Sequence, residues 1–397
     1  MKSHPLRLMA VLCTLMGFAS ISTDFYLPAM PTMARDLHAD AGTLEQTVAA
    51  YLIGFSLGQL FWGPVGDRFG RKRPIAVGLL FFVIGSAGCA MADSTMAVIV
   101  WRVVQACGAC AGVVLSRAMV RDLFGPERSG PMMSTLISIM AIAPLIGPLL
   151  GGAILAAAGW RAIFWTLVGV GLLTAAGLAT IPETLPSSRR AAGTLWDSFR
   201  SYPALLVDRR VMACALLGGG YYVGVYAYVA GSPFAFITFH GVSPQAYGLL
   251  FALGILGIMA ANQLNIRLLR LTSSDVLIRS GTFAAALSGA VLLVNAGFGW
   301  GGLWGLVLPC VAYVSASGLL VANSMGVAMG HRPQQAGAVS ALLGAAQYGC
   351  GVLGSAAVGA FANGTPVPMG LAIALGGAVA WFGATVAMPA NQSGGAR

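Results

Sequence analysis

Twelve apolar segments of about 20 residues dominate this chain of 397 residues, and about 20 apolar residues suffice to cross the hydrocarbon core of a bilayer. Only 9% of the residues are charged and the mean hydropathy is +0.82, whereas soluble domains carry about 25% charged residues. We therefore predict an all-α, polytopic membrane protein whose function lies in its twelve spans. The segments lie at about 8–28, 46–64, 74–92, 96–118, 131–156, 161–180, 210–232, 245–265, 276–296, 301–326, 335–361 and 366–388.

The basic residues are distributed unevenly between the predicted loops. The formal net charge is +10, yet the face opposite the N-terminus keeps only Arg35 and Arg161. This asymmetry follows the positive-inside rule, so we expect a multi-pass protein of a bacterial inner membrane with both termini in the cytoplasm. The charge then reflects topology, and the expected partners are the lipid bilayer and a small-molecule substrate rather than nucleic acid.

One long polar stretch divides the twelve segments into two sets of six. We predict an N-terminal six-helix bundle at 1–180, a cytoplasmic connector at 181–209 and a C-terminal six-helix bundle at 210–397. Apolar residues recur at near-helical spacing within the connector. They are consistent with a short helix on the membrane interface, and a flexible tether is the alternative.

A glycine-rich, strongly charged loop follows the second segment and reads GPVGDRFGRKRP from Gly63. A carboxylate at one helix end can pair with an arginine on its neighbour in one conformation and release it in another. We predict that this loop is a conformational latch, although its charges could serve only to fix topology. The residues assigned to the latch are Gly63, Asp67, Arg68, Gly70 and Arg71.

Asp24 is the single acidic residue that the predicted boundaries leave inside a span, since they place Glu45 in an external loop. An ionisable group within the membrane is costly and by default functional. A carboxyl group there can bind and release a proton as its surroundings change. We therefore predict that Asp24 carries the coupling proton; the alternative is that it caps the helix end or snorkels toward water.

Arg102 and Arg117 are the two basic residues inside predicted spans, about 60° apart around an ideal helix. Arg102 and Gln105 lie at the depth of Asp24, so an Asp24–Arg102 ion pair could be either switchable or permanent. Arg117 lies close enough to the cytoplasm to snorkel. We assign both arginines to proton coupling together with Asp24.

Small residues in the fifth segment recur every fourth position, at Ala143, Gly147 and Gly151. Such a stripe permits close helix packing, while Pro144 and Pro148 each remove a backbone donor. We expect a bent and tightly packed helix, for which a purely structural kink is the alternative.

Aromatic and amide side chains inside the spans are candidates for substrate contact. Aromatic rings with a few hydrogen-bonding tips suit bulky, partly apolar ligands, although such residues also serve as packing or interface belts. The candidates are Tyr26, Tyr51, Phe55, Gln59, Gln105, Tyr222, Tyr226, Phe234, Asn323, Gln347 and Tyr348.

Other chemistries find little support in the sequence. Lys2 and Lys72 are the only lysines, so the chain has no phosphate-binding loop lysine of an ATPase. The four histidines lie at ends and in loops without paired spacing, which indicates no metal site. We expect no enzymatic activity and no cofactor, with protons as the coupling ion.

Four motifs resemble those of a known family. The loop from Gly63 to Pro74 resembles the loop signature of the major facilitator superfamily, and residues 102–108 resemble its fourth-span arginine motif with Ala106 in place of glycine. Residues 143–152 resemble the fifth-span antiporter motif. Residues 22–31, together with 117–124, are similar to the Bcr/CflA group of drug–proton antiporters.

This resemblance implies two bundles with nested inverted triplets of helices and a substrate site at the midplane between them. It also implies that the fifth-span motif seals one end of the cavity against proton leak. We accordingly expect a monomeric, proton-coupled multidrug efflux antiporter for neutral or zwitterionic amphipathic antibiotics, phenicol-like or bicyclomycin-like. The alternatives are a proton-coupled exporter of sugars or amino-acid derivatives and a membrane receptor that does not transport.

Overall fold

A computed structural model describes residues 5–140, 142–190 and 202–387, and within these ranges it contains helices and no strands. Eleven of the described helices are long and apolar enough to cross a membrane. A further apolar helix, Ile142–Ala158, has 17 residues. The predicted all-α membrane fold is therefore confirmed.

Contacts along the chain define two compact units. The first comprises Met1–Ser198 and Ser243–Ala252, and the second comprises Phe199–Val242 and Leu253–Arg397. The division after Ser198 falls inside the predicted connector. The short stretch Ser243–Ala252 groups with the first unit, although the sequence places it in the C-terminal bundle.

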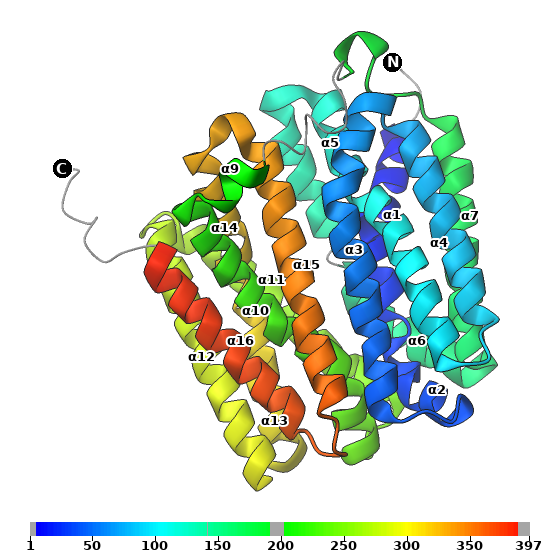
Figure 1. The fold of residues 1–397 in the computed structure, drawn as a ribbon, viewed down its shortest axis with the longest axis vertical. Coiled ribbons are helices and arrows are strands. Elements are labelled where there is room, and N and C mark those ends of the chain that lie inside the picture. Colours follow the sequence, from blue (N-terminus) through cyan, green and yellow to red (C-terminus); the bar gives the residue numbers. More distant parts are fainter. Residues whose placement is uncertain (1–4, 141, 191–201, 388–397) are drawn as a thin grey trace. The chain divides into compact units, whose positions relative to one another are not determined.

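Helices of the first unit lie side by side as a bundle (Figure 1). α5 packs against α1, α3 and α4, while α4 also contacts α7 and α1 contacts α6. Small residues allow close approach: a Cβ at Gly54 would lie 2.4 Å from the Val103 oxygen. The elements are α1 (Pro5–Asp24), η1 (Leu27–Ala29), α2 (Met30–Asp36), α3 (Ala41–Phe69), α4 (Lys72–Ala90), α5 (Thr95–Met140), α6 (Ile142–Ala158), α7 (Trp160–Thr180) and η2 (Ser187–Arg189).

The second unit is also a helical bundle, in which α10 contacts α14, α15 and α16, and α12 contacts α13, α14 and α16. Two buried tyrosines join α10 to α13. The rings of Tyr221 and Tyr313 stack at 5.2 Å, and each hydroxyl donates to the other residue's backbone oxygen, at 3.2 Å and 2.9 Å. The elements are α9 (Tyr202–Leu206), α10 (Arg209–Pro233), the π-helical η3 (Phe234–Phe239), α11 (Pro244–Leu268), α12 (Ser274–Phe298), α13 (Gly302–Ser315), α14 (Ser317–His331), η4 (Pro333–Gln335), α15 (Ala336–Ala360) and α16 (Val367–Ala387).

Aspartates cap the first helix turns outside the membrane. The Asp40 carboxylate accepts the Thr43 backbone N–H at 2.6 Å, and this hydrogen bond lowers the pKa of Asp40. Asp208 caps α10 and pairs with Arg332 at 2.6 Å. Burial alone would raise the pKa of Asp208, but the backbone donors and Arg332 outweigh burial and lower it. Both caps favour helix initiation where the chain enters the bilayer.

Helix boundaries in the first unit differ from the sequence prediction. α5 continues from Thr95 to Met140, beyond the predicted fourth-span end near 118, and α6 begins at Ile142. The predicted fifth span, 131–156, is therefore built from the end of α5 and from α6. In the connector, residues 191–201 lie outside the described residues, so the choice between an interfacial helix and a tether stays open.

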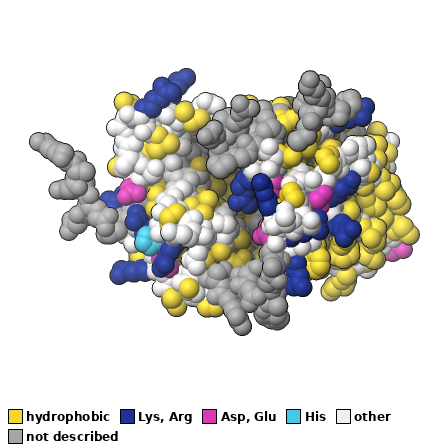
Figure 2. Space-filling view, turned by 90° about the horizontal axis from the view of Figure 1, so that it is seen from above, with side chains coloured by type: hydrophobic (Ala, Val, Ile, Leu, Met, Phe, Trp, Pro, Cys, Tyr) yellow, Lys and Arg dark blue, Asp and Glu magenta, His cyan; other side chains and the backbone are white. Residues whose placement is uncertain are grey.

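Basic side chains stand out in the end-on view of Figure 2. Where α3 gives way to α4, the side chains of Arg68 and Arg73 are exposed. In the second unit, the exposed Arg267 and Arg270 lie where α11 ends. The helix order thus brings the arginines of these two loops to helix ends, as a topological role for their charge requires.

Candidate functional site

Arg102, in α5, is the centre of the candidate site. Its side chain is 0% exposed, and its guanidinium carbon lies 4.3 Å from the ring centroids of both Tyr26 and Tyr51. Nη1 donates to the Ser22 backbone oxygen at 2.8 Å and to Gln105 Oε1 at 2.6 Å. The charge is therefore held by two aromatic faces and by two neutral acceptors.

A second layer of hydrogen bonds fixes these partners. Gln105 Nε2 donates to Ser86 Oγ at 2.8 Å, and the Tyr26 hydroxyl lies 3.1 Å from Thr47 Oγ1. Arg102 Nε and Nη2 are buried with no hydrogen-bond partner among the described residues, as is the Tyr51 hydroxyl. Because buried polar groups are normally paired, these free donors are suited to an anionic group.

Asp24 is the last residue of α1, two positions beyond Ser22. Its side chain is 7% exposed and makes no ion pair or hydrogen bond within the part of the chain that the structure describes. The Asp24–Arg102 pair considered from the sequence is not formed there. A buried carboxyl group without a counter-charge is least costly as the neutral acid.

The small residues of α6 pack directly on this end of α1. A Cβ added at Gly147 would lie 3.0 Å from the Asp24 Cβ, and one at Gly151 would lie 1.9 Å from the Phe25 backbone oxygen. Pro148 is buried beside them, whereas Pro144 is half-buried. The fifth-span motif and the membrane acid, far apart in sequence, therefore lie in contact.

Two of the five residues assigned to the latch, Asp67 and Arg71, form an ion-pair network with Asp122. The buried Arg71 bonds Asp67 through Nη1 at 2.7 Å and Asp122 through Nε at 2.8 Å. Burial would lower the pKa of Arg71, but the two carboxylates raise it above its usual value. The end of α3, the start of α4 and α5 are thereby tied at one point.

A reciprocal pair of caps adds α7 to this network. The Glu183 carboxylate accepts the backbone N–H groups of Arg71 at 2.9 Å and Lys72 at 3.1 Å. The Lys72 ammonium donates to the backbone oxygens of Ala179 at 2.9 Å and Ile181 at 2.8 Å. Burial would raise the pKa of Glu183, but the backbone donors lower it below its usual value.

The remaining latch residues take different positions. Gly70 has φ +89°, and a Cβ there would lie 2.6 Å from Glu183 Oε2, so this position requires glycine. Gly63 faces open space. Arg68 is exposed, with its guanidinium 5.6 Å from the Phe69 ring. The ion pairs therefore centre on Arg71, with Arg68 outside them.

Candidate substrate residues of the first unit fall into two groups. Tyr26, Tyr51 and Gln105 hold Arg102, as described above. Phe55 is buried and stacks on Tyr51 with ring centroids 6.1 Å apart, and Gln59 is buried on the same helix. Most of this set therefore surrounds the arginine.

In the second unit, Tyr222 and Tyr226 of α10 meet Tyr348 of α15. All three pairs of ring centroids are 5.9 Å apart, and each side chain is partly exposed. Gln347 is buried beside α10, 3.2 Å from the place of a Cβ at Gly218. The structure thus gathers four of the predicted residues on two helices.

Two other candidates of the second unit lie apart from this cluster. Asn323 donates to Asn265 Oδ1 at 2.8 Å and to the Leu319 oxygen at 2.9 Å, so its amide is engaged within its own bundle. Phe234 is the first residue of η3. In the first unit, Arg117 is exposed, unlike the buried Arg102.

The described residues contain no group of three His, Cys, Asp or Glu side chains placed to hold a metal ion. The charged and titratable groups described above offer proton exchange at a carboxyl group and ion pairing. Among the described residues, a buried arginine with unpaired donors bonds the Ser22 backbone oxygen, two positions before a buried acid that makes no ion pair. A separate network of ion pairs and hydrogen bonds links α3, α4, α5 and α7.

Comparison with known families gives a match over most of the chain. Residues 12–355 match the family described as Major Facilitator Superfamily. The chain belongs to the Major Facilitator Superfamily. The resemblance seen in the sequence motifs is thereby confirmed, and as a member of this superfamily the protein is a multi-pass membrane transporter.

Relatives of this Major Facilitator Superfamily member extend over nearly its full length. It is 35% identical to the "Uncharacterized MFS-type transporter YdgK" of Bacillus subtilis, over 92% of each chain. It is 30% identical to the "Bicyclomycin resistance protein homolog" of Haemophilus influenzae, over 87% of each chain. It is 33% identical to the "Chloramphenicol resistance protein" of Pseudomonas aeruginosa, over 78% of this chain and 72% of that one.

Solved structures support the superfamily fold. A D-xylose-proton symporter has a TM-score of 0.73 at 16% identity, covering 96% of this chain and 97% of the other. A human organic anion transporter has a TM-score of 0.70 at 17% identity, covering 97% and 100%. At these identities the likeness concerns the fold alone.

Sequence reasoning missed several residues of the site. Glu45 is not in a loop as expected: α3 begins at Ala41, after the Asp40 cap, so the Glu45 side chain lies in the helix and is 3% exposed. Glu183 reads as an ordinary loop acid. Ser22 bonds Arg102 only through its backbone oxygen. Any residue type carries this atom, so the sequence cannot indicate the contact.

Proposed function

We propose that this protein is a proton-coupled efflux antiporter that exports small amphipathic antibiotics by alternating access. Superfamily membership supports transport. The relatives named for bicyclomycin and chloramphenicol resistance support neutral or zwitterionic antibiotics as the substrate class. The uneven distribution of basic residues supports a bacterial inner membrane with both termini in the cytoplasm.

One observation carries the coupling mechanism. Arg102 is fully buried, faces two aromatic rings, and keeps two nitrogens, Nε and Nη2, unpaired among the described residues. Asp24, two positions beyond the Ser22 oxygen that Arg102 bonds, is buried and makes no ion pair or hydrogen bond within the described ranges. When Asp24 is protonated, its neutral carboxyl group and the Arg102 guanidinium can both keep the arrangement seen in the structure. When Asp24 loses its proton, its carboxylate needs a cation, and the unpaired donors of Arg102 can pair with it. The charge of Asp24 thus selects between two arrangements.

The proton balance of a cycle follows directly. Asp24 binds one proton from outside and releases it to the cytoplasm, while one substrate molecule moves outward. With a neutral substrate, one net charge crosses the membrane, worth about 2.3 kcal/mol per 100 mV. At about 150 mV this drives the exchange by about 3.5 kcal/mol, enough for several-hundredfold accumulation.

Packing around Asp24 supports exchange without leak. Gly147 and Gly151 let α6 approach the end of α1 at the level of Asp24 and Phe25. This close contact leaves little room for a water chain along that side of the acid. We propose that the seal keeps proton release dependent on the conformational change.

The latch is proposed to act at the cytoplasmic end. Arg71 bonds Asp67 and Asp122 in the described arrangement, so α3, α4 and α5 are held together there. Separation of these helix ends requires at least one of the pairs to break. The network therefore stabilises one of the two states of the cycle.

Substrate contact is assigned to aromatic side chains of the second unit. Tyr222, Tyr226 and Tyr348 offer partly exposed rings with hydroxyl tips. Such groups bind apolar bodies with a few polar atoms. A neutral or zwitterionic substrate fits better than a dication, because the buried charge at the site is the arginine. We expect one such molecule per monomer and per proton.

The test is substrate-induced pH change in proteoliposomes, for the wild type and Asp24→Asn. We expect the variant to lose substrate-driven proton movement, because an amide cannot exchange a proton. Asp275→Asn, which removes an acid from the first turn of α12, is the matched control and should exchange at the wild-type rate. Coupled exchange at the wild-type rate in Asp24→Asn would overturn the proposal.

The same vesicles distinguish the other functions. Proton movement with sugars or amino-acid derivatives but not with phenicol-like or bicyclomycin-like compounds would indicate a metabolite exporter. Ligand binding without any proton movement or substrate flux in the wild type would indicate a receptor. Either result contradicts drug–proton exchange.

A further inference from the structure

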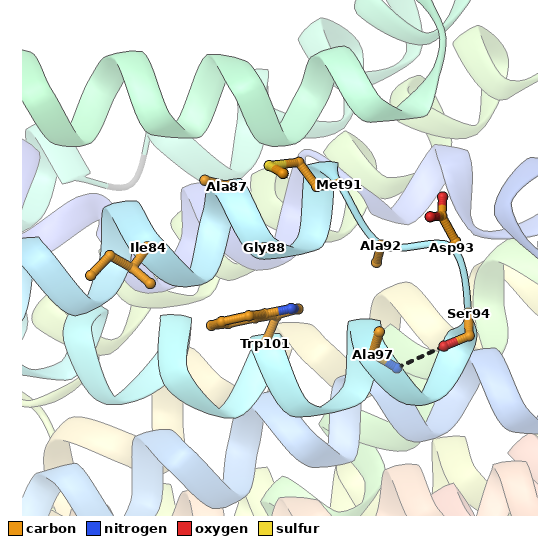
Figure 3. A pocket seen from close by; sticks show the side chains of 9 residues that line it. All are labelled: Ile84, Ala87, Gly88, Met91, Ala92, Asp93, Ser94, Ala97 and Trp101. Carbon is orange, nitrogen blue, oxygen red and sulfur yellow. Dashed lines mark hydrogen bonds between the residues drawn. The ribbon is translucent and has the colours of Figure 1, made fainter.

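A groove lies between α4 and α5 of the first unit, at the helix ends opposite the latch (Figure 3). Its volume is about 680 Å³, within the usual range for ligand pockets. It is open on one side, and most of its lining is apolar. The lining residues are Ile84, Ala87, Gly88, Met91, Ala92, Asp93, Ser94, Ala97 and Trp101.

Small residues and one indole shape this groove. A Cβ at Gly88 would lie 2.2 Å from the Trp101 ring, so the indole lies flat against the α4 backbone (Figure 3). Ala87 and Ala97 leave the space beside it unfilled. Ile84 and Met91 at its edge are exposed, which places the open side toward the apolar surroundings of the helices.

The groove has the length of an acyl chain segment in one leaflet. From Ile84 to Met91 the α4 axis rises roughly 10 Å at 1.5 Å per residue. One leaflet contributes about 15 Å of hydrocarbon, half of the ~30 Å core. The groove can thus hold most of one acyl chain and cannot form a path across the membrane.

Charged groups of both signs stand at the polar end. The Arg161 guanidinium donates to the backbone oxygen of Ala92 at 3.2 Å and lies 3.5 Å from the Asp93 carboxylate. It also lies 4.2 Å from the Trp160 ring centroid. The side chains of Arg161 and Asp93 are 45% and 95% exposed, so both charges remain accessible to a ligand.

We propose that this groove is a binding site for a membrane phospholipid with a zwitterionic, ammonium-bearing headgroup, such as phosphatidylethanolamine. One acyl chain lies along Ile84, Ala87 and Trp101. The phosphate pairs with Arg161, and the ammonium donates to Asp93. The order of these groups along the protein matches that of the lipid. The apolar groove corresponds to the acyl chain, and Arg161 and Asp93 at the membrane surface correspond to the headgroup.

The charge pair determines which headgroup is preferred. A phosphatidylcholine carries the same net charge but has no N–H donor for Asp93, and a phosphatidylglycerol has no cation at all. The preference therefore requires both charged residues, whereas a surface that merely contacts bulk lipid has no headgroup preference. This difference separates the proposed site from the rest of the apolar surface.

The test uses quenching of tryptophan fluorescence by brominated phospholipids in bilayers containing the full chain. The contribution of Trp101 is the difference between wild type and Trp101→Phe. We expect brominated phosphatidylethanolamine to quench this contribution with about threefold higher apparent affinity than brominated phosphatidylcholine, the scale of one or two exposed ion pairs. Brominated phosphatidylglycerol should also bind more weakly.

Trp381 on α16 is the matched control, because it is 48% exposed and lies outside the groove. Its contribution, from Trp381→Phe, should show no headgroup preference. Asp93→Asn and Arg161→Gln should each remove the preference at Trp101, and Ala97→Phe should reduce quenching there by filling the groove. Equal quenching of Trp101 by all three headgroups, or a preference that survives both charge variants, would overturn the proposal.

Discussion

At the scale of single residues, the buried guanidinium of Arg102 is the most informative group. Its planar face contacts two aromatic rings while one edge donates to Ser22 and Gln105. Only arginine combines a flat cation with several fixed donors. A positive charge alone is therefore not sufficient at position 102, which requires arginine itself.

Arg102→Lys tests this requirement. The variant keeps the charge but loses the stacked geometry, and cation–π contacts contribute about 0.5–2 kcal/mol each. We expect proton-coupled exchange to fall roughly tenfold or more, on the scale of that loss, while the protein remains folded. Substrate-induced pH change measures the rate and thermal unfolding measures the fold. Arg35→Lys, at an exposed position, should change neither, and full exchange in Arg102→Lys would refute the role.

The sequence points to Arg102, Gln105 and Asp24 because ionisable and amide groups are rare in apolar segments. It does not show how they are arranged. Tyr26 and Tyr51 read equally well as substrate contacts, and only the packing of α1, α3 and α5 shows that both rings face the arginine. Similarly, the bonding of Asn323 to Asn265 depends on the pairing of α14 with α11.

At the scale of elements, α6 packs closely on the residue that follows α1, where Gly151 meets Phe25. A methyl group at Gly151 would lie 1.9 Å from a backbone oxygen, which cannot move as a flexible side chain can. The helices must therefore separate if this glycine is replaced.

Gly151→Ala should lower the unfolding temperature, because overpacking typically costs about 1–3 kcal/mol. Gly169→Ala in α7 is the matched control, since a Cβ there meets nothing within 4 Å. That control should be neutral or slightly stabilising through higher helix propensity. Thermal unfolding in detergent measures both, and an unchanged unfolding temperature in Gly151→Ala would contradict the close contact.

The reciprocal caps between α4 and α7 predict a pH dependence. The folded-state pKa of Glu183 is lowered from 4.5, so its contribution to stability is present above that value. The contribution is lost as the pH falls below 4.5 through the folded-state pKa. We expect acidification from about pH 6 to about pH 4 to lower the unfolding temperature of the wild type more than that of Glu183→Gln.

The exposed Asp93 provides the control for this pH effect. Asp93→Asn should keep the pH dependence of the wild type, because its side chain is 95% exposed. Tryptophan fluorescence during heating follows unfolding in all three proteins. Parallel curves for the wild type and Glu183→Gln would show that the cap does not act as described.

Element boundaries show where hydropathy is a sufficient guide. The apolar segments locate every described long helix, because the bilayer sets their length. They misplace the end of the fourth span, since α5 continues to Met140 through residues that read as a polar loop. They also misplace Glu45, because the Asp40 cap starts α3 one turn earlier than the apolar pattern does.

At the scale of the whole molecule, the even number of predicted spans and the basic loops specify a topology. Fusions that end after Ser94 or Val242 should give active alkaline phosphatase, which requires export. After Thr272 and at the C-terminus, fusions to alkaline phosphatase should be inactive. Fusions to green fluorescent protein at the same two positions should be fluorescent. These outcomes follow from the positive-inside rule, and phosphatase activity after Thr272 would reverse the assignment.

The superfamily and the two-bundle plan were accessible from the sequence, because the motifs lie on the segments that the bilayer already defines. The ion-pair network was accessible only in part. Asp67 and Arg71 lie four positions apart in the sequence, whereas Asp122 and Glu183 reach Arg71 through tertiary packing. Local sequence carries no signal for such distant partners.

The caps that join α4 to α7 also constrain how the chain is made. Glu183 lies 112 positions after Arg71. Its carboxylate can therefore cap the start of α4 only after the ribosome has synthesised the intervening helices. At 5–20 residues per second this delay is roughly 6–20 s. During biogenesis the α4–α7 caps therefore form only after the sixth span has been synthesised, whereas Arg71 can pair with Asp67 and Asp122 before then.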